Sequence, residues 1–175
     1  HVLIAGETAK GRLRRLTEEG IRTKYPAGTF AYRDRVEYEL KIIEDMQYTD
    51  YLCIVQDYLD YGRQLGLQCP EGVGYAIGPG RGSAAGSLVC YLIGITSVDP
   101  MPLGLLFERF LNPDRVTSPD IDADLSMEVR GKVLEYVKGK YGEDAVCCIT
   151  TKDTLAAKAA VKAVARVRGS EKFGD

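Results

Sequence analysis

The chain has 175 residues, of which 45% are hydrophobic, and carries 23 basic and 25 acidic side chains. The formal net charge of −2 excludes a uniformly basic nucleic-acid binder, so any basic surface has to be local. This length suits one domain or a part of a larger protein, with enough apolar content for a core. No apolar run is long enough to cross a bilayer and no signal peptide is visible, so we expect a cytoplasmic protein without a membrane partner.

The cysteine and histidine contents exclude several kinds of site. Five cysteines occur, and no two of them form a C-x-x-C pair: Cys53, Cys69, Cys90, Cys147 and Cys148. We therefore predict reduced thiols, mostly in the core, rather than a disulfide framework or a zinc site. The one histidine is His1, so a mechanism that requires an internal imidazole is excluded.

Three helices are predicted in the first third of the chain. Residues 1–30 read as a peripheral helix that ends at Tyr25-Pro26, and residues 31–47 show the apolar spacing of an amphipathic helix. A third helix begins at Thr49 or Asp50, either of which can cap it. Four tyrosines accompany it, and we expect them to pack between helices rather than to stack on bases: Tyr48, Tyr51, Tyr58 and Tyr61.

A glycine-rich turn follows, with the sequence Gly78-Pro79-Gly80-Arg81-Gly82-Ser83. We predict a short strand over residues 73–77 before it and a helix over residues 88–95 after it. Strand, glycine turn and helix start together present backbone N–H groups to an anion, with Ser83 as the helix cap and Arg81 as an added donor. The alternative is a tight turn that needs glycines for its conformation. The Lys-Ser/Thr ending of a Walker loop is missing, and so is the acidic residue of a dinucleotide fingerprint.

Three aspartates then alternate with apolar residues in Asp120-Ile121-Asp122-Ala123-Asp124. In a strand their side chains would share one face, roughly 6.5 to 7 Å apart, where like charges repel unless a cation lies over them. Carboxylates are suitable ligands for Mg²⁺ or Mn²⁺. A solvated strand edge or turn is the alternative interpretation.

The flanking basic residues also allow two interpretations each. Arg109 and Arg115 precede the aspartates, either as their counter-charges or as donors to the phosphates of a substrate. Further on we predict a helix over residues 127–141 that ends at Gly142, a short strand over residues 145–150, and a helix over residues 153–168. Three basic residues line up on that last helix, either along a nucleic-acid backbone or on a solvated face: Lys158, Lys162 and Arg166.

Together these features favour phosphoryl or nucleotidyl transfer assisted by two metal ions, because this chemistry needs carboxylate-held cations and donors to the non-reacting phosphates. Three motifs also carry a resemblance: Gly78 to Ser83, Leu106-Phe107-Glu108-Arg109-Phe110-Leu111-Asn112-Pro113, and Pro119 to Asp124. In order and spacing they resemble the palm motifs of the bacterial replicative DNA polymerases of family C. This is the family to which the DNA polymerase III alpha subunit belongs.

The resemblance implies an α+β fold, a palm of the nucleotidyltransferase type shared with DNA polymerase beta, with a mixed sheet flanked by helices. Residues 31–150 would form this palm and residues 151–175 the start of the thumb. On the family pattern Asp120 and Asp122 are catalytic and bind two Mg²⁺ ions, with Asp124 beside them. The expected contacts to the nucleotide and its phosphates come from Arg81, Gly82, Ser83, Arg109 and Arg115.

The resemblance also implies partners and a departure from the family. The expected partners are primer-template DNA and dNTP and, for the full-length protein, the sliding clamp, the clamp loader and the proofreading subunit. The third catalytic aspartate of the family lies downstream of this sequence, so we expect an excised fragment that is inactive by itself. The alternatives are another nucleotidyltransferase of the same fold and a non-enzymatic module that binds phosphate or nucleic acid, in which the aspartates only balance arginines.

Overall fold

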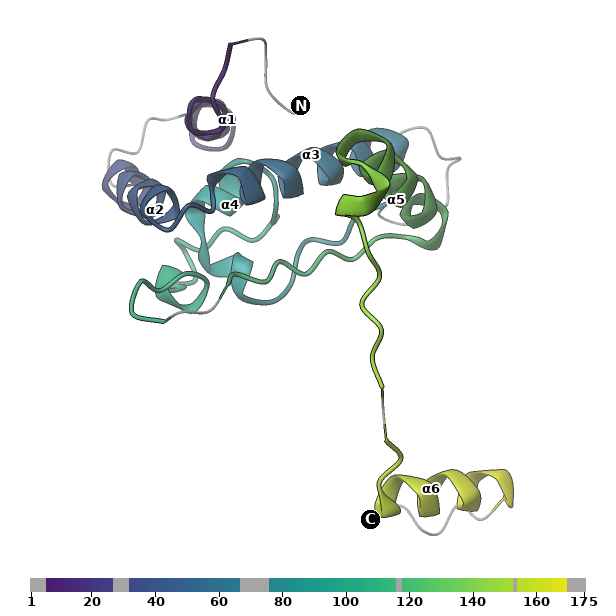
Figure 1. Cartoon of the computed structure of the whole chain (residues 1–175). Helices are drawn as coiled ribbons and strands as arrows, with labels where there is room; N and C mark the ends of the chain where they lie inside the picture. The colour runs from purple at the N-terminus through teal and green to yellow at the C-terminus, as the bar shows by residue number, and fades with distance from the viewer. Residues whose placement is uncertain (1–5, 27–31, 67–75, 116–117, 153, 170–175) are drawn as a thin grey trace. The chain divides into compact units, whose positions relative to one another are not determined.

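A computed structural model describes residues 6–26, 32–66, 76–115, 118–152 and 154–169 (Figure 1). The chain divides into two compact units, residues 1–145 and 146–175, and each is described here by itself. Within the described ranges no helix is both long and apolar enough to span a membrane.

The three helices predicted in the first third of the chain are confirmed. They are α1 (Ala9–Lys24), α2 (Arg33–Asp45) and α3 (Thr49–Gly66). The Thr8 side chain accepts a hydrogen bond from the Gly11 N–H and so caps the start of α1. Leu13 on α1 is completely buried, so this helix contributes to the core.

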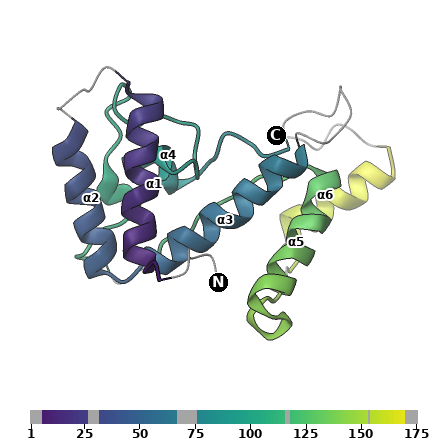
Figure 2. The same ribbon diagram turned by 90° about the horizontal axis from the view of Figure 1, so that it is seen from above.

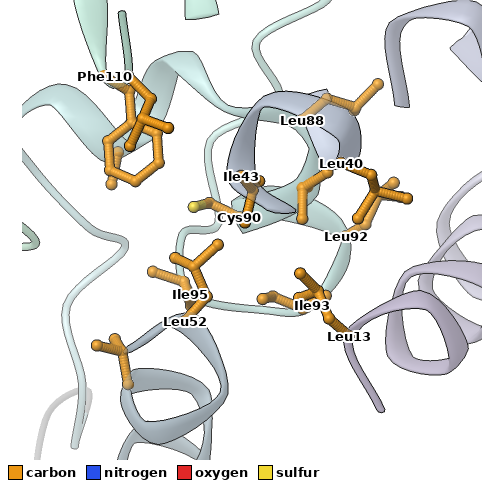
Figure 3. Packing of buried hydrophobic residues seen from close by; sticks show 14 of the residues in the cluster. Leu13, Leu40, Ile43, Leu52, Leu88, Cys90, Leu92, Ile93, Ile95 and Phe110 are labelled. Atoms are coloured by element: carbon orange, nitrogen blue, oxygen red, sulfur yellow. The ribbon is translucent and has the colours of Figure 1, made fainter. Parts of the chain in front are cut away.

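The core of the first unit is built around a short apolar helix, α4 (Leu88–Leu92). Helices α1 and α2 both contact α4, and α3 packs against α1 (Figure 2). Figure 3 shows how side chains from these four helices interlock around Cys90, Leu92 and Ile93. Continuous apolar sequence from Leu88 to Ile95 is what allows α4 to be surrounded in this way.

The predicted mixed sheet is wrong. Among the residues that the structure describes there is no β-strand, only an isolated antiparallel bridge between Ile77 and Leu125. Residues 73–75 of the first predicted strand lie outside the described residues, and the predicted strand at 145–150 is absent. The period-two alternation at residues 120–124 belongs to an extended segment whose backbone neighbour is the irregular segment at residues 76–83 rather than another strand. The described part of the chain is therefore helical.

Helix α5 (Met127–Tyr141) has the predicted bounds and ends at Gly142, whose φ of 98° favours glycine. It packs against α3, and the rings of Tyr61 and Tyr136 stack with centroids 3.9 Å apart. The carboxylate of Asp57 accepts hydrogen bonds from Tyr136 and Tyr141 in the same interface. The tyrosine of α3 thus packs between helices here, as predicted.

The second unit contains α6 (Ala157–Val167), which begins four residues later than predicted. Its three predicted contacts to nucleic acid, Lys158, Lys162 and Arg166, are all exposed. Cys147 and Cys148 are exposed free thiols, whereas Cys53 and Cys90 are buried free thiols in the first unit. The prediction of core thiols is thus confirmed for two of the four cysteines described, and Cys69 lies outside the described residues.

Candidate functional site

The three aspartates project from one side of an extended segment. Asp120, Asp122 and Asp124 are exposed, while Ile121 between them is 9% exposed and joins the core. Tyr51 on α3 lies close to the backbone of Ile121. Burial raises the pKa of the Tyr51 hydroxyl, although the neighbouring Ile121 backbone acts in the opposite direction. The sequence therefore predicted correctly which residues face solvent.

The aspartate segment runs beside the glycine-rich turn (Figure 1). The backbone N–H of Gly78 donates to the carbonyl oxygen of Asp124 at 2.9 Å, and the N–H of Ser126 donates to Ala76 at 3.0 Å. At the far end of the turn the Ser83 hydroxyl donates to the carbonyl oxygen of Asp120 at 3.5 Å. The structure thus brings the two predicted motifs together over their whole length.

Gly82 is the point of closest approach between the turn and a carboxylate. Its backbone has φ 72° and ψ −157°, a region that is nearly exclusive to glycine. A Cβ atom added here would lie only 2.7 Å from Oδ2 of Asp122. Glycine at this position therefore serves two needs, the backbone conformation and the room for the Asp122 carboxylate.

Arg81 supplies the positive charge next to the aspartates. Its Nε lies 3.5 Å from Oδ1 of Asp124, and its Nη2 lies 3.9 Å from Oδ1 of Asp122. All three side chains are largely exposed, so these ion pairs contribute little to stability. The sequence predicted Arg81 as a donor to a phosphate, and in the structure its guanidinium faces the two carboxylates.

The donor set at this place suits a divalent cation held partly by its substrate. Mg²⁺ typically binds proteins through one or two carboxylates and completes its shell with water and phosphate oxygens. Asp120 and Asp122 offer such carboxylates on the exposed side of the segment. The described residues hold no group of three acidic, cysteine or histidine side chains that could bind a metal alone. The residues therefore fit a substrate-assisted site rather than a cage made only of protein.

A pocket of about 420 Å³ opens directly beside the turn. One wall comes from Gly82, Ser83, Ala85 and Gly86, and the other from Leu105, Leu106 and Arg109. Three of the residues predicted to contact the nucleotide and its phosphates, Gly82, Ser83 and Arg109, thus line the same pocket. Arg115 does not line it; this exposed residue lies in a turn in which its N–H donates to Asn112.

The start of α4 is not free to bind a phosphate, contrary to the prediction. Ser83 opens a 3₁₀ segment, η2 (Ser83–Gly86), and the residue that caps α4 is Ser87, which accepts from the Cys90 N–H at 3.1 Å. A carboxylate from the chain itself already occupies the N-terminal end of α4. The carboxylate of Glu39 accepts from the N–H groups of Leu88 and Val89 at 3.0 and 2.9 Å. An external phosphate would have to bind at Ser83 and in the pocket instead.

Glu39 is a residue that the sequence analysis missed. Its side chain is completely buried, receives a further hydrogen bond from the Ser87 hydroxyl, and pairs with Arg35 at 2.6 Å. Burial raises the pKa of the Glu39 carboxyl, although its hydrogen bonds oppose that rise. A signal existed in the sequence: Glu39 stands within the apolar series of Val36, Leu40 and Ile43, where a charge requires a buried partner.

Comparisons of the sequence with known proteins match this chain to one family. The family model described as "Bacterial DNA polymerase III alpha NTPase domain" matches residues 11–173. Three relatives are each named DNA polymerase III subunit alpha. The one from Thermus aquaticus is 55% identical over 135 residues, 77% of this chain and 10% of its own length. Those from Aquifex aeolicus and Bacillus subtilis are each 45% identical, over 167 and 164 residues. These cover 93% and 94% of this chain but only 14% of either relative, so the chain spans a small part of its relatives.

Proposed function

Because the chain belongs to the bacterial DNA polymerase III alpha family, we propose that it supplies nucleotide- and metal-binding residues of a DNA-directed DNA polymerase in chromosomal replication. The reaction is nucleotidyl transfer from a dNTP to the 3′-hydroxyl of a primer. One observation carries the proposal: the Asp122 carboxylate lies against Gly82, and Gly82 lines a pocket together with Ser83 and Arg109.

The residues divide into two groups by chemistry. Asp120 and Asp122, with Asp124 beside them, would hold two Mg²⁺ ions on the exposed side of the extended segment. When bound, those ions would lower the pKa of the primer hydroxyl and stabilise the charge on the leaving pyrophosphate. Ser83 and Arg109 would hold the triphosphate in the pocket, since a hydroxyl and a guanidinium both donate to phosphate oxygens.

Two further arginines would assist the phosphates from outside the pocket. Arg81 contacts Asp122 and Asp124 through exposed pairs of 3.5 to 3.9 Å, weak enough for a bound triphosphate to take over its donors. Arg115 is exposed and follows the same segment as Arg109. We assign it to phosphate binding on the family pattern alone.

The second unit would contact the primer-template duplex. Lys158 and Lys162 lie four residues apart on α6, and Arg166 follows at the same interval, so the three form one line on the helix. Such a line can follow a phosphate backbone. Contacts with the sliding clamp, the clamp loader and the proofreading subunit would belong to the parts of the relatives that this chain does not span.

A second candidate is a non-enzymatic phosphate-binding module, and the contacts of Arg81 with Asp122 and Asp124 favour it. A site that only balances charge should have no metal affinity that depends on the aspartates. Titration of Mn²⁺ into the chain and into the double variant Asp120→Asn plus Asp122→Asn separates the two. We expect the wild-type affinity to disappear in the double variant.

The activity itself is tested by grafting. We would replace the matching segment of the Thermus aquaticus subunit, with which the chain shares 55% identity, by this sequence and measure Mg²⁺-dependent extension of a primed template. We expect extension by the graft and a loss of at least ~100-fold in Asp122→Asn, the scale on which one lost group that stabilises transition-state charge slows an enzyme.

Asp45→Asn is the matched control, since among the residues described this exposed carboxylate makes only a surface pair with Lys41 at 3.5 Å. Its activity should equal that of the unmodified graft. Extension that survives in Asp122→Asn at the level of Asp45→Asn would contradict the assignment.

A further inference from the structure

Arg35 joins the two walls of the pocket through their backbones. It lies near the start of α2, with its side chain 22% exposed. Its Nη2 donates both to the carbonyl oxygen of Gly86 at 3.1 Å and to that of Leu105 at 3.2 Å. Gly86 lines one wall and Leu105 the other. A single guanidinium therefore holds a backbone carbonyl of each wall.

The two walls also lie in close contact at Gly86. A Cβ atom on Gly86 would lie 2.7 Å from the carbonyl oxygen of Leu106, so backbone packs directly on backbone. Without side chains between them, the separation of the walls depends on the hydrogen bonds that hold their carbonyls. Arg35 provides two of those bonds.

Glu39 fixes Arg35 and the first wall at the same time. It lies one helical turn after Arg35 and accepts from its Nε at 2.6 Å. The same carboxylate accepts from Ser87, Leu88 and Val89, which directly follow the wall formed by residues 82–86. The first wall is thus bound to α2 from two sides, by Arg35 at Gly86 and by Glu39 just beyond it.

The second wall has its own attachment to α2. The Tyr38 hydroxyl donates to the Glu108 carboxylate at 2.8 Å, and its ring meets Phe107 edge to face with centroids 6.1 Å apart. Phe107 is completely buried and begins η3 (Phe107–Arg109), the short segment that carries Arg109. Both walls of the pocket are therefore attached to the same helix, α2.

We propose that Arg35 and Glu39 form a positioning pair, which sets the spacing of the pocket walls so that Ser83 and Arg109 grip the same triphosphate. The proposal rests on the proposed function for the identity of that ligand. Stability alone is a weak reason for this pair, because buried ion pairs are often no more stabilising than apolar side chains of similar size. An arginine is required because its planar fork can serve a carboxylate and two carbonyls together.

Arg35→Lys tests the proposal in the grafted polymerase. Lysine keeps the positive charge beside Glu39, but its one ammonium cannot replace the Nε and Nη2 contacts together. We expect the KM for dNTP to rise by about tenfold while kcat changes less than about threefold, because the walls lose their common support but the aspartates are untouched. The affinity for primed DNA should stay the same.

The matched control is Val36→Ala, on the neighbouring residue of α2. Val36 is 3% exposed and contributes to the core, so its truncation destabilises the unit without removing a hydrogen bond to either wall. At a temperature where both variants are folded, Val36→Ala should leave the KM for dNTP unchanged. A KM for Arg35→Lys within twofold of the unmodified graft, or an equal rise in Val36→Ala, would overturn the proposal.

A binding measurement without catalysis separates this proposal from the proposed function. The affinity of the chain for inorganic triphosphate, measured by calorimetry at low salt, should fall by about tenfold in Arg35→Lys and not in Val36→Ala. If the graft fails to extend primers while this difference is present, the polymerase assignment fails and the positioning pair stands. If the graft is active and the two variants bind triphosphate equally, the positioning pair fails alone.

Discussion

Substitution of Gly82 by alanine should impair metal binding at the aspartates far more than it impairs the fold. Two costs coincide at this residue. The backbone has φ 72° and ψ −157°, where an L side chain is strained, and the new Cβ would lie 2.7 Å from Oδ2 of Asp122. No real Cβ contact is that short, so the Asp122 carboxylate has to move.

The expected loss of stability in Gly82→Ala depends on how far the structure can relieve the strain and the clash. Backbone strain of this type costs about 1–3 kcal/mol and cannot be avoided without refolding the turn. The clash is different, because the Asp122 side chain is 43% exposed and can rotate into solvent. We therefore expect Gly82→Ala to lower the free energy of unfolding by about 1–3 kcal/mol, with the displaced carboxylate appearing as lost metal affinity.

Two other glycines provide matched controls. Gly142 has φ 98° with nothing within 4 Å of an added Cβ, so Gly142→Ala brings strain without a clash. Gly131 lies inside α5 and also has open space, so Gly131→Ala should stabilise the chain by about 0.5–1 kcal/mol. Neither control should alter the carboxylates.

Urea unfolding and Mn²⁺ titration of the three variants give the result. Gly82→Ala and Gly142→Ala should lose similar stability, but only Gly82→Ala should lose most of its Mn²⁺ affinity. Unchanged Mn²⁺ affinity in Gly82→Ala, or an equal loss in Gly142→Ala, would refute the placement of Asp122 against the turn.

Three further predictions concern charged side chains. Since burial raises the pKa of Glu39 above its ordinary 4.5, the folded chain binds this proton more tightly than the unfolded chain. The free energy of unfolding of the wild type minus that of Glu39→Gln should therefore decrease as the pH rises from about 4.5 to 7; an increase would contradict the buried carboxyl. Arg81→Gln removes a cation beside Asp122 and Asp124 and should raise Mn²⁺ affinity by up to about fivefold, with a decrease as the contrary result. Replacement of the three basic residues of α6 by glutamine should reduce the salt dependence of DNA binding by about two to three in log-log slope, and an unchanged slope would exclude them from the interface.

The helices were predictable because their signals are local. Met127 to Tyr141 carries a clear apolar stripe, and Gly142 supplies the left-handed residue that ends it, so both bounds follow from a few neighbouring positions. The exposure of the aspartates on either side of Ile121 was equally local, since side chains alternate along any extended segment.

The absence of the sheet could not be predicted from such local signals. Alternation shows that a segment is extended with one buried side, but a strand also needs a neighbour along its length. Here the neighbour is the glycine-rich turn, which is too irregular to form a strand, so the bridge between Ile77 and Leu125 stays isolated among the residues described. Glu39 was missed for a related reason, because its partners at Ser87 to Val89 lie some fifty residues away in sequence.

The most direct test is a crystal structure of the chain with Mn²⁺ and dATP, in which anomalous scattering locates the metal. We predict a Mn²⁺ peak about 2 Å from carboxylate oxygens of Asp120 or Asp122, with the triphosphate in the pocket between Ser83 and Arg109. A metal and triphosphate bound away from these carboxylates and this pocket would contradict the account.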